Sequence, residues 1–572
     1  MPVSPCPRVL SATRLPIKIP RETTRLVQAM AQRNVRQGYY SLEVPEVRPE
    51  TPRGFGKRNP KSGRVQYAAY WLAIAVCVST WFVAIRAPLW LDETISFFLI
   101  KGGFAGIMSR QVWPDAPAYS CLLWLWTRAI GTAEITLRIS SILPMAGAVY
   151  LLYCSARRLF ERDLALIATI IFCLHPIVVF ASIDVRPYAF AALAVNSSLF
   201  VLVCLRDNDS TWLAALFGLT AAFIVQFHLL FAVILPALLL CFFALKNRKG
   251  KSFWRQLGVA LVIFALALLP AIRRLLMLRR TGSTHVFSTA PRLTQLGSTL
   301  AVRGSAVVLI IGVIFALGTR RLSFKSLPNR WTILLCLSLA LVPALTLFSL
   351  STATPIHVFI PRYELVAVPG IALSWALVAS LMDSRPLRLW CALAMVAVMA
   401  SISFTSASAR SHGQSWKAAL AFVDKNASGD NAPVLICSGI SESDYMVMPT
   451  GAAIENSGVL VQLSYYKLGD PVVPLPHSLN EQAMRLGSRF VEQEAYRHER
   501  FLAMAFAQSS RTLDWLARDA MGTDYVHELG VFDGIRVLEF VPRDARYEAN
   551  ANLSQRAPAS PDEARVRSSL HP

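Results

Sequence analysis

The chain has 572 residues, of which 54% are hydrophobic and only 16% are charged, and its mean hydropathy is +0.45. This composition excludes an ordinary soluble globular protein of the same length. The net charge of +22 does not indicate a nucleic-acid partner, because the basic residues gather in short segments between apolar runs, as in the cytoplasmic loops of membrane proteins. We therefore expect a protein whose main solvent is the lipid bilayer.

Residues 1–66 are rich in Arg, Pro and Ser and contain no apolar core of the roughly 7 to 15 residues that a cleavable signal peptide needs. We expect a basic, disordered arm on the cytoplasmic side. Apolar runs of about 18 to 20 residues then recur from Tyr67 to about Ala409, each long enough to cross a hydrocarbon core of about 30 Å as a helix. They lack the alternation of barrel strands, so residues 67–410 are predicted to form an α-helical membrane domain.

These runs predict eleven transmembrane helices, at residues 67–85, 139–156, 164–182, 187–205, 211–227, 229–245, 255–272, 302–318, 331–350, 365–382 and 388–406. The apolar stretch 119–130 is short for a span and contains Trp124, Trp126 and Arg128, which suit the membrane interface. If it lies flat in the first outer loop, the later basic loops share one side with the N-terminal arm. The outer face then carries residues 86–138, 183–186, 273–301 and 351–364 and the chain after about residue 407.

The chain changes character after residue 410, and the mixed polar and apolar composition of residues 411–543 predicts a small soluble α/β domain. Residues 433–437 and 535–541 are typical of strands, and residues 416–426 and 481–506 have helical patterns. Residues 544–572 are polar, and we expect a disordered tail.

The adjacent acids Asp92 and Glu93 follow directly after the first predicted span. Taken alone, such a pair is typical of a hydrated loop or a helix cap. A carboxylate beside apolar surface also has a pKa that suits a general base, or it can bind a divalent cation. Both readings stay open at this point.

Two further segments place acids at the predicted outer face. Asp115 lies between two prolines that stiffen the chain before Tyr119, and alone it is equally typical of a turn. Asp184 and Arg186 lie between two spans, where charges are usually functional or paired, and a simple salt bridge that holds the hairpin is the alternative.

Basic and aromatic residues complete the set of candidates. Arg362, followed by Tyr363, lies at another outer span edge and is suited to clamp a phosphate, although an interfacial arginine there also snorkels without any ligand. His228 lies at a turn between two spans, where a histidine is more often simply packed.

Five motifs, taken in order, resemble the bacterial GT-C glycosyltransferases related to the protein O-mannosyltransferases and the lipid A aminoarabinose transferase. They are Leu91-Asp92-Glu93, Asp115 to Tyr119, Ala133 to Arg138, Arg158-Leu159-Phe160 and Asp184 to Tyr188. The resemblance continues through His228 and Pro361-Arg362-Tyr363 and covers about residues 67–430. The chain departs from the family at Ala116 and Ala118, where a second proline and a further tyrosine are usual, and at Asp184, where glutamate is common.

The resemblance implies about 11 membrane helices with interfacial helices in the first outer loop, and transfer of a sugar from a polyprenyl-phosphate donor to an acceptor hydroxyl. It implies Asp92 as the catalytic base beside Glu93, with Glu93, Asp115 and Asp184 to orient the acceptor or hold a possible divalent cation. The expected substrate-binding residues are Asp115, Tyr119, Arg138, Asp184, Arg186, Tyr188, His228, Arg362 and Tyr363.

The same resemblance implies a bacterial inner membrane location, an active site that faces the periplasm, and inversion at the anomeric carbon in a single displacement. The acceptor would be a glycolipid or a protein. A transporter or flippase of lipid-linked saccharide is the main alternative, and it predicts charges near the midplane and broken helices. A scaffold protein is a third reading, which leaves the acidic loop unexplained.

Overall fold

The computed structural model describes residues 60–109, 117–245, 250–281, 289–304, 306–324, 327–355, 357–405, 414–426, 432–495, 500–521 and 526–541. The chain divides into two units, Met1–Ser62 and Gly63–Pro572. The predicted arm lies outside the described residues up to residue 59, and so does the predicted tail 544–572.

Within the described part of the chain, seven helical segments are long and apolar enough to cross a membrane. They lie on α2 (Pro60–Ser79) with η1 (Thr80–Phe82), α6 (Glu134–Leu159), α9 (Tyr188–Asp207), α12 (Lys251–Thr281), α15 (Arg330–Ala353), α16 (Pro361–Glu364) with η6 (Leu365–Ala367) and α17 (Val368–Ala379), and α18 (Arg385–Thr405). The helical membrane fold expected from the apolar runs is therefore confirmed.

An eighth candidate span is broken. Helices α7 (Arg162–Leu174) and α8 (Pro176–Ile183) meet at a 64° bend, because Pro176 cannot continue the hydrogen bonding of α7 and disfavours helical backbone at His175. Shorter apolar helices occupy the three remaining predicted spans: α10 (Thr211–Phe227), η2 (Leu229–Ile234) with α11 (Leu235–Phe243), and α14 (Val307–Gly318). The number of eleven crossings stays a prediction.

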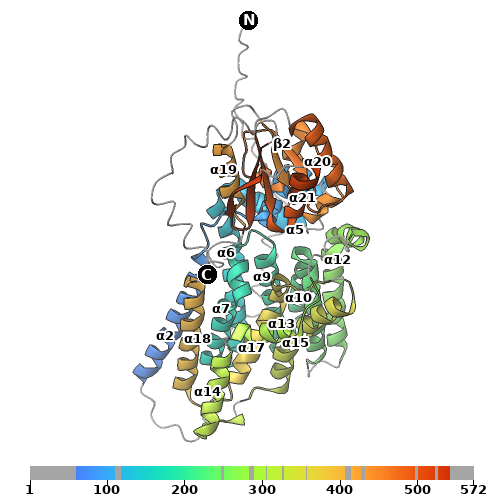
Figure 1. Ribbon diagram of the computed structural model, residues 1–572. Helices are drawn as coiled ribbons and strands as arrows, with labels where there is room; N and C mark the ends of the chain where they lie inside the picture. Colours follow the sequence, from blue (N-terminus) through green and yellow to red (C-terminus); the bar gives the residue numbers. More distant parts are fainter. Residues whose placement is uncertain are drawn as a thin grey trace, which may run out of the picture. The chain divides into compact units, whose positions relative to one another are not determined.

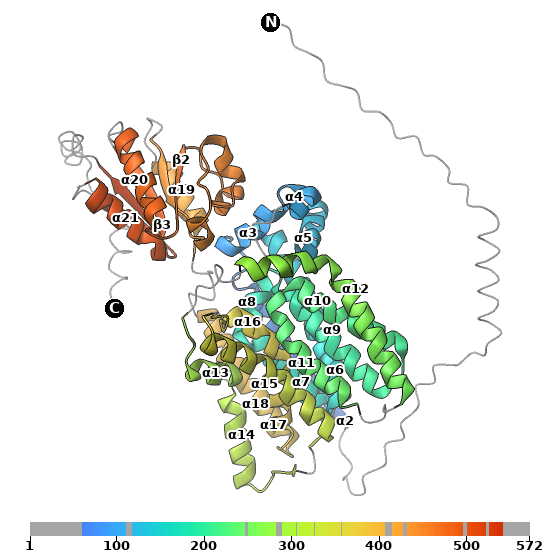
Figure 2. The same ribbon diagram turned by 90° about the vertical axis from the view of Figure 1, so that its right-hand side faces the viewer.

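Helix α9 forms the centre of the bundle and α12 its periphery, since 78% of the apolar window of α9 is buried inside the protein but only 22% of that of α12. Three helices without a full span, α3 (Leu91–Ile100), α4 (Gly103–Ser109) and α5 (Pro117–Ile130), lie together at one end of the bundle (Figures 1 and 2). Helix α5 coincides with the stretch expected to lie flat. Helix α13 (Leu293–Leu300) precedes α14.

The C-terminal domain contains one five-stranded sheet in the order β2-β1-β3-β5-β4. Its strands are β1 (Val434–Cys437), β2 (Val472–Leu475), β3 (Phe501–Phe506), β4 (Val526–Phe532) and β5 (Ile535–Phe540). Strands β2, β1 and β3 are parallel, whereas β5 pairs antiparallel with both β3 and β4. Asp533 and Gly534 join the β4–β5 hairpin with φ of 45° and 85°, as a tight turn of this kind requires.

Helices cover both faces of this sheet, α19 (Trp416–Asn426) on one and α20 (Glu481–Gln493) with α21 (Ser510–Trp515) on the other (Figure 1). The predicted helix 416–426 and the predicted strands are present. The helix predicted over 481–506 is wrong in its second half, because Phe501–Phe506 is the central strand β3. A six-residue apolar run fits either element, and its pairing with both β1 and β5 decides for the strand.

Close helix packing gives a test of the bundle. A Cβ on Gly218 of α10 would overlap the Ala260 carbonyl of α12, whereas a Cβ on Gly258 of α12 would meet nothing within 4 Å. We expect Gly218→Ala to lower the free energy of unfolding in detergent by about 1–3 kcal/mol through overpacking. Gly258→Ala, the matched control, should leave it unchanged or raise it, and equal effects in thermal unfolding would contradict this packing.

Candidate active site

Asp92 and Glu93 lie in the first turn of α3, where the unpaired N–H groups of a helix N-terminus favour negative charge. The chain enters this helix with Trp90 in extended backbone, and Glu93 Oε2 accepts a hydrogen bond from the Trp90 backbone N–H at 3.1 Å. Two adjacent residues of one helix turn point to different sides, so the two acids have different surroundings.

Glu93 is fully buried and forms an ion pair with Arg138 of α6, with 2.9 Å between Oε2 and Nη2. Its second oxygen, Oε1, accepts from the Val185 backbone N–H at 2.9 Å. The buried Arg138 guanidinium also donates to three backbone carbonyls, those of Ala87, Pro88 and Ile183. Burial raises the pKa of the Glu93 carboxyl, and the Arg138 charge opposes that rise. This ion pair therefore joins α3, α6 and the turn before α9.

Asp184 lies in that turn and is also fully buried. Its Oδ1 accepts from Trp90 Nε1 at 3.0 Å, and its backbone carbonyl accepts from the Ser141 hydroxyl at 2.6 Å. Oδ2 has no hydrogen-bond partner among the described residues. Burial, followed by the nearby Glu93 carboxylate, raises the pKa of Asp184 to about 8. Asp184 therefore holds a proton at neutral pH.

Asp92 is the accessible acid, with 18% of its side chain exposed, and its Oδ2 forms an ion pair with Arg362 of α16. Arg186 lies next to this pair and donates to the Asp92 backbone carbonyl at 3.3 Å and to the Ser96 hydroxyl at 3.5 Å. One guanidinium group thus pairs with a carboxylate that solvent can reach, and a second binds the backbone carbonyl of the same residue. This arrangement can bind an anion and can take up a proton.

Aromatic rings surround the Arg362 side of this pair. His228 lies between Tyr188 and Tyr363, with ring centroids 5.2 and 5.0 Å away, and the Arg362 guanidinium lies 5.5 Å from the centre of the Tyr363 ring. Burial, together with the charges of Arg186 and Arg362, lowers the pKa of His228 to about 3. His228 is therefore neutral, and it adds no positive charge to the site.

Tyr119 of α5 is buried with its ring centroid 5.7 Å from that of Phe190 on α9. Burial raises the pKa of its phenol, and the Arg186 guanidinium is near enough to oppose that rise. Tyr119 thus lies on the Arg186 side of the site and stays protonated.

Ten of the eleven predicted site residues are described, and the contacts above join them into one connected set. Asp115 lies outside the described residues. The catalytic and binding roles of all eleven residues stay predictions. Two neighbours were not predicted: Trp90 and Ser96, of which Ser96 lies one helical turn after Asp92, a spacing visible in the sequence.

The described residues contain no group of three His, Cys, Asp or Glu side chains that suits a metal ion. Asp92 and Glu93 bond to different guanidinium groups, so this arrangement of the pair does not fit a shared divalent cation. A divalent cation at this site stays a prediction. Measuring sugar transfer in the presence of a chelator tests it.

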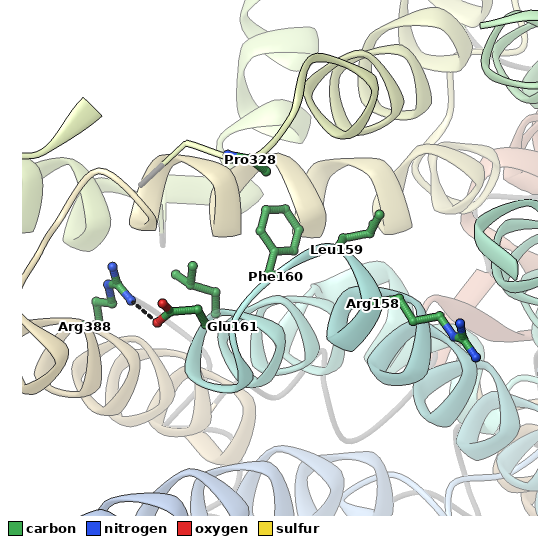
Figure 3. A pocket seen from close by; sticks show the side chains of 7 residues that line it. Arg158, Leu159, Phe160, Glu161, Pro328 and Arg388 are labelled. Carbon is green, nitrogen blue, oxygen red and sulfur yellow. Dashed lines mark ion pairs between the residues drawn. The ribbon is translucent and has the colours of Figure 1, made fainter. Parts of the chain in front are cut away.

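A pocket of about 260 Å³ lies elsewhere, around the motif Arg158-Leu159-Phe160 at the C-terminal end of α6 (Figure 3). Arg158 is twenty residues after Arg138 on the same helix, or about 30 Å away. Acids already pair with the arginines of this pocket: Asp207 pairs with Arg158, and Glu161 and Asp163 pair with Arg388. The pocket is therefore separate from the cluster around Asp92.

Part of this chain is similar to a known protein family. Residues 114–272 match the model of the dolichyl-phosphate-mannose-protein mannosyltransferase family. That segment contains seven of the predicted site residues, namely Asp115, Tyr119, Arg138, Asp184, Arg186, Tyr188 and His228. No curated protein is detectably similar in sequence to the chain.

The fold is similar to that of ArnT from Cupriavidus metallidurans. The apo crystal structure of ArnT aligns with a TM-score of 0.51 and 12% identity over 84% of this chain and 98% of that chain. The crystal structure of ArnT bound to undecaprenyl phosphate aligns with a TM-score of 0.50 and 11% identity over the same shares. At this identity the likeness is one of fold.

The buried ion pair generates the first prediction from the site. Arg138→Met leaves the Glu93 carboxylate buried without its partner, and we expect the free energy of unfolding to fall by about 3–5 kcal/mol. Arg158→Met is the matched control on the same helix, because its pair with Asp207 is exposed and contributes about 0–1 kcal/mol. Thermal unfolding in detergent measures both, and an Arg138 variant as stable as the control would contradict the assignment.

Asp184 generates a prediction about pH. Its pKa is raised from the ordinary value of 3.8 to about 8 in the folded protein, so the folded state binds the proton more tightly than the unfolded state. The contribution of this bound proton to the free energy of unfolding is fully present below about pH 4. It is lost as the pH rises through about 8, by at most about 1.4 kcal/mol per pH unit. We expect Asp184→Asn to remove this fall in thermal stability. Asp207→Asn, at an exposed acid, should leave it in place.

Proposed function

We propose that the chain is a glycosyltransferase of the GT-C type, and that it transfers a sugar from a polyprenyl-phosphate donor to an acceptor hydroxyl. The observation that carries this proposal is the accessible Asp92 carboxylate paired with Arg362, with the Arg186 guanidinium bound to the backbone carbonyl of the same residue. Such a site holds both a base for the acceptor and cations for the donor phosphate.

The donor phosphate would bind at Arg362 and Arg186. Guanidinium groups bind phosphate oxygens through paired, charge-assisted hydrogen bonds, and a phosphate competes with Asp92 for Arg362. Binding of the donor would therefore draw Arg362 from Asp92 and leave that carboxylate free to accept a proton. The crystal structure of ArnT with undecaprenyl phosphate supports a lipid-linked donor, because that protein shares this fold.

In the proposed reaction the acceptor oxygen attacks the anomeric carbon while its proton passes to the Asp92 carboxylate. The bond between the anomeric carbon and the phosphate oxygen breaks, and the polyprenyl phosphate leaves with the electron pair. Arg362 and Arg186 balance the charge that develops on the leaving phosphate. A single displacement of this kind inverts the configuration at the anomeric carbon.

The buried residues would keep these groups in place. Glu93 and Arg138 bind each other and the backbone on either side of the site, so neither is available to a substrate in this arrangement. We therefore assign Glu93 to positioning and leave the proton transfer to Asp92. His228 and Tyr363, backed by the buried Tyr188, form an uncharged aromatic wall on which a sugar ring or the first isoprene unit can pack.

We further propose that the site faces the periplasm from the inner membrane of a bacterium, and that the acceptor is a glycolipid or protein hydroxyl. The distribution of basic loops supports this orientation. The transferred sugar would be a hexose or a pentose.

One observation favours the alternative of a transporter or flippase, since the 64° break between α7 and α8 is the kind of broken helix that such proteins use. The acids of the site nevertheless lie on α3 and in the turn between α8 and α9, outside the seven candidate spans. We retain transfer as the proposed function, and the assay separates the two.

The assay uses purified protein, radiolabelled polyprenyl-phosphate sugars and membrane acceptors. We expect Asp92→Asn to lower kcat by about 10²–10⁴-fold with donor binding retained, because the amide cannot accept the proton. Arg362→Met should weaken donor binding as well. Asp207→Asn, at an exposed acid paired with Arg158, serves as the control and should transfer normally.

Transfer that survives Asp92→Asn would remove Asp92 as the base. Absence of transfer by the wild-type protein with every donor, together with movement of lipid-linked saccharide across vesicles, would replace the proposed function by transport.

A further inference from the structure

The C-terminal domain contacts two of the three residues that precede Asp92. The Leu89 backbone N–H donates to the Tyr466 hydroxyl at 2.6 Å, and the Leu91 backbone N–H donates to Gln414 Oε1 at 3.4 Å. Trp90, between them, donates hydrogen bonds to two residues of the membrane domain, Asp184 and Glu93. The segment 89–91 therefore has one set of partners in each domain.

Tyr466 lies in the loop between β1 and β2 and is almost fully buried. Its hydroxyl accepts from Leu89 and donates to Glu134 Oε1 at 2.8 Å, at the start of α6. Lys417 of α19 pairs with the other oxygen of Glu134 at 2.9 Å. One phenol thus links the segment before α3 to the helix that carries Arg138.

Leu91 lies at the carboxyl ends of the parallel strands. A Cβ on Gly439, just after β1, would lie 2.9 Å from Leu91 Cδ2 and 3.8 Å from Phe506, the last residue of β3. The chain runs from β1 to β2 on one side and returns to β3 on the other, so the strand order reverses between β1 and β3. Sheets of this kind usually bind ligands at that crevice. Here a leucine of the membrane domain lies there.

We propose that the C-terminal domain positions the catalytic acid, with Tyr466 and Gly439 as positioning residues that hold Leu89 and Leu91 so that Asp92 meets Arg362. This proposal rests on the proposed function, in which Asp92 is the base. Asp92 directly follows Leu91, so a shift of the segment 89–91 moves its carboxylate relative to Arg362. Displacement of a reacting group by about 1 Å can cost about 100-fold in rate.

Two conservative variants test the proposal. Tyr466→Phe removes only the hydroxyl that binds Leu89, and Gly439→Ala places a methyl group against Leu91. We expect each to lower kcat by about 10- to 100-fold while KM for the polyprenyl-phosphate sugar stays within about twofold. Tyr465→Phe is the matched control, because its hydroxyl bonds to the Thr132 carbonyl and not to the segment 89–91.

Hydrogen exchange of the peptide that contains residues 86–92 gives a readout that does not depend on activity. We expect the Leu89 amide to exchange at least tenfold faster in Tyr466→Phe than in the wild type, and to be unchanged in Tyr465→Phe. A loss of activity with unchanged exchange in Tyr466→Phe would overturn the proposal. So would normal kcat in both Tyr466→Phe and Gly439→Ala.

A second substitution tests the contact at Gly439. Leu91→Ala removes the side chain that the added methyl group meets, so combining it with Gly439→Ala should recover kcat relative to Gly439→Ala alone. No recovery would contradict positioning through Leu91. If the wild-type protein transfers no sugar from any donor, the proposed function fails, and the exchange of Leu89 in Tyr466→Phe still decides whether the domain holds this segment.

Discussion

The ion pair between Glu93 and Arg138 is the interaction on which the rest of the site depends. Both side chains are fully buried, where an unpaired charge is costly, so each requires the other to be in place. Through its remaining hydrogen bonds the pair binds the chain before α3 and the turn before α9. Asp92 directly follows the first segment, and Arg186 lies on the second. The geometry of the partly exposed pair at Asp92 is therefore set by a buried pair one residue away.

In this arrangement the adjacent acids Asp92 and Glu93 have different roles. Glu93 has a guanidinium group and two backbone N–H groups as hydrogen-bond donors, whereas Asp92 is partly exposed and has a partner, Arg362, that an incoming phosphate can attract. In the proposed reaction, the buried acid holds the loop and the accessible acid exchanges its partner when the donor binds. A protonated Asp184 fits the same scheme, because it keeps a second negative charge away from Glu93.

The C-terminal domain extends the scheme beyond the membrane domain. Its sheet presents the carboxyl ends of β1 and β3 to Leu91, and its Tyr466 bonds to Leu89. Parallel sheets of this kind usually bind a ligand at the carboxyl ends of such strands. Here the same place holds a segment of the protein's own membrane domain, a role that the α/β fold alone would not indicate. The proposed positioning of Asp92 makes the two domains one functional unit.

The sequence by itself determined the helical membrane architecture, the α/β character of the C-terminal domain and the candidates Asp92, Arg186 and Arg362, because hydropathy, periodicity and motif order are local properties. It did not distinguish the buried Glu93 from the partly exposed Asp92, did not identify β3, and contained no signal for Tyr466. Only the tertiary structure decided these points. Burial, strand pairing and hydrogen-bond partners depend on residues that can be hundreds of positions apart, as Leu89 and Tyr466 are. The local sequence around either residue contains no information about such a contact.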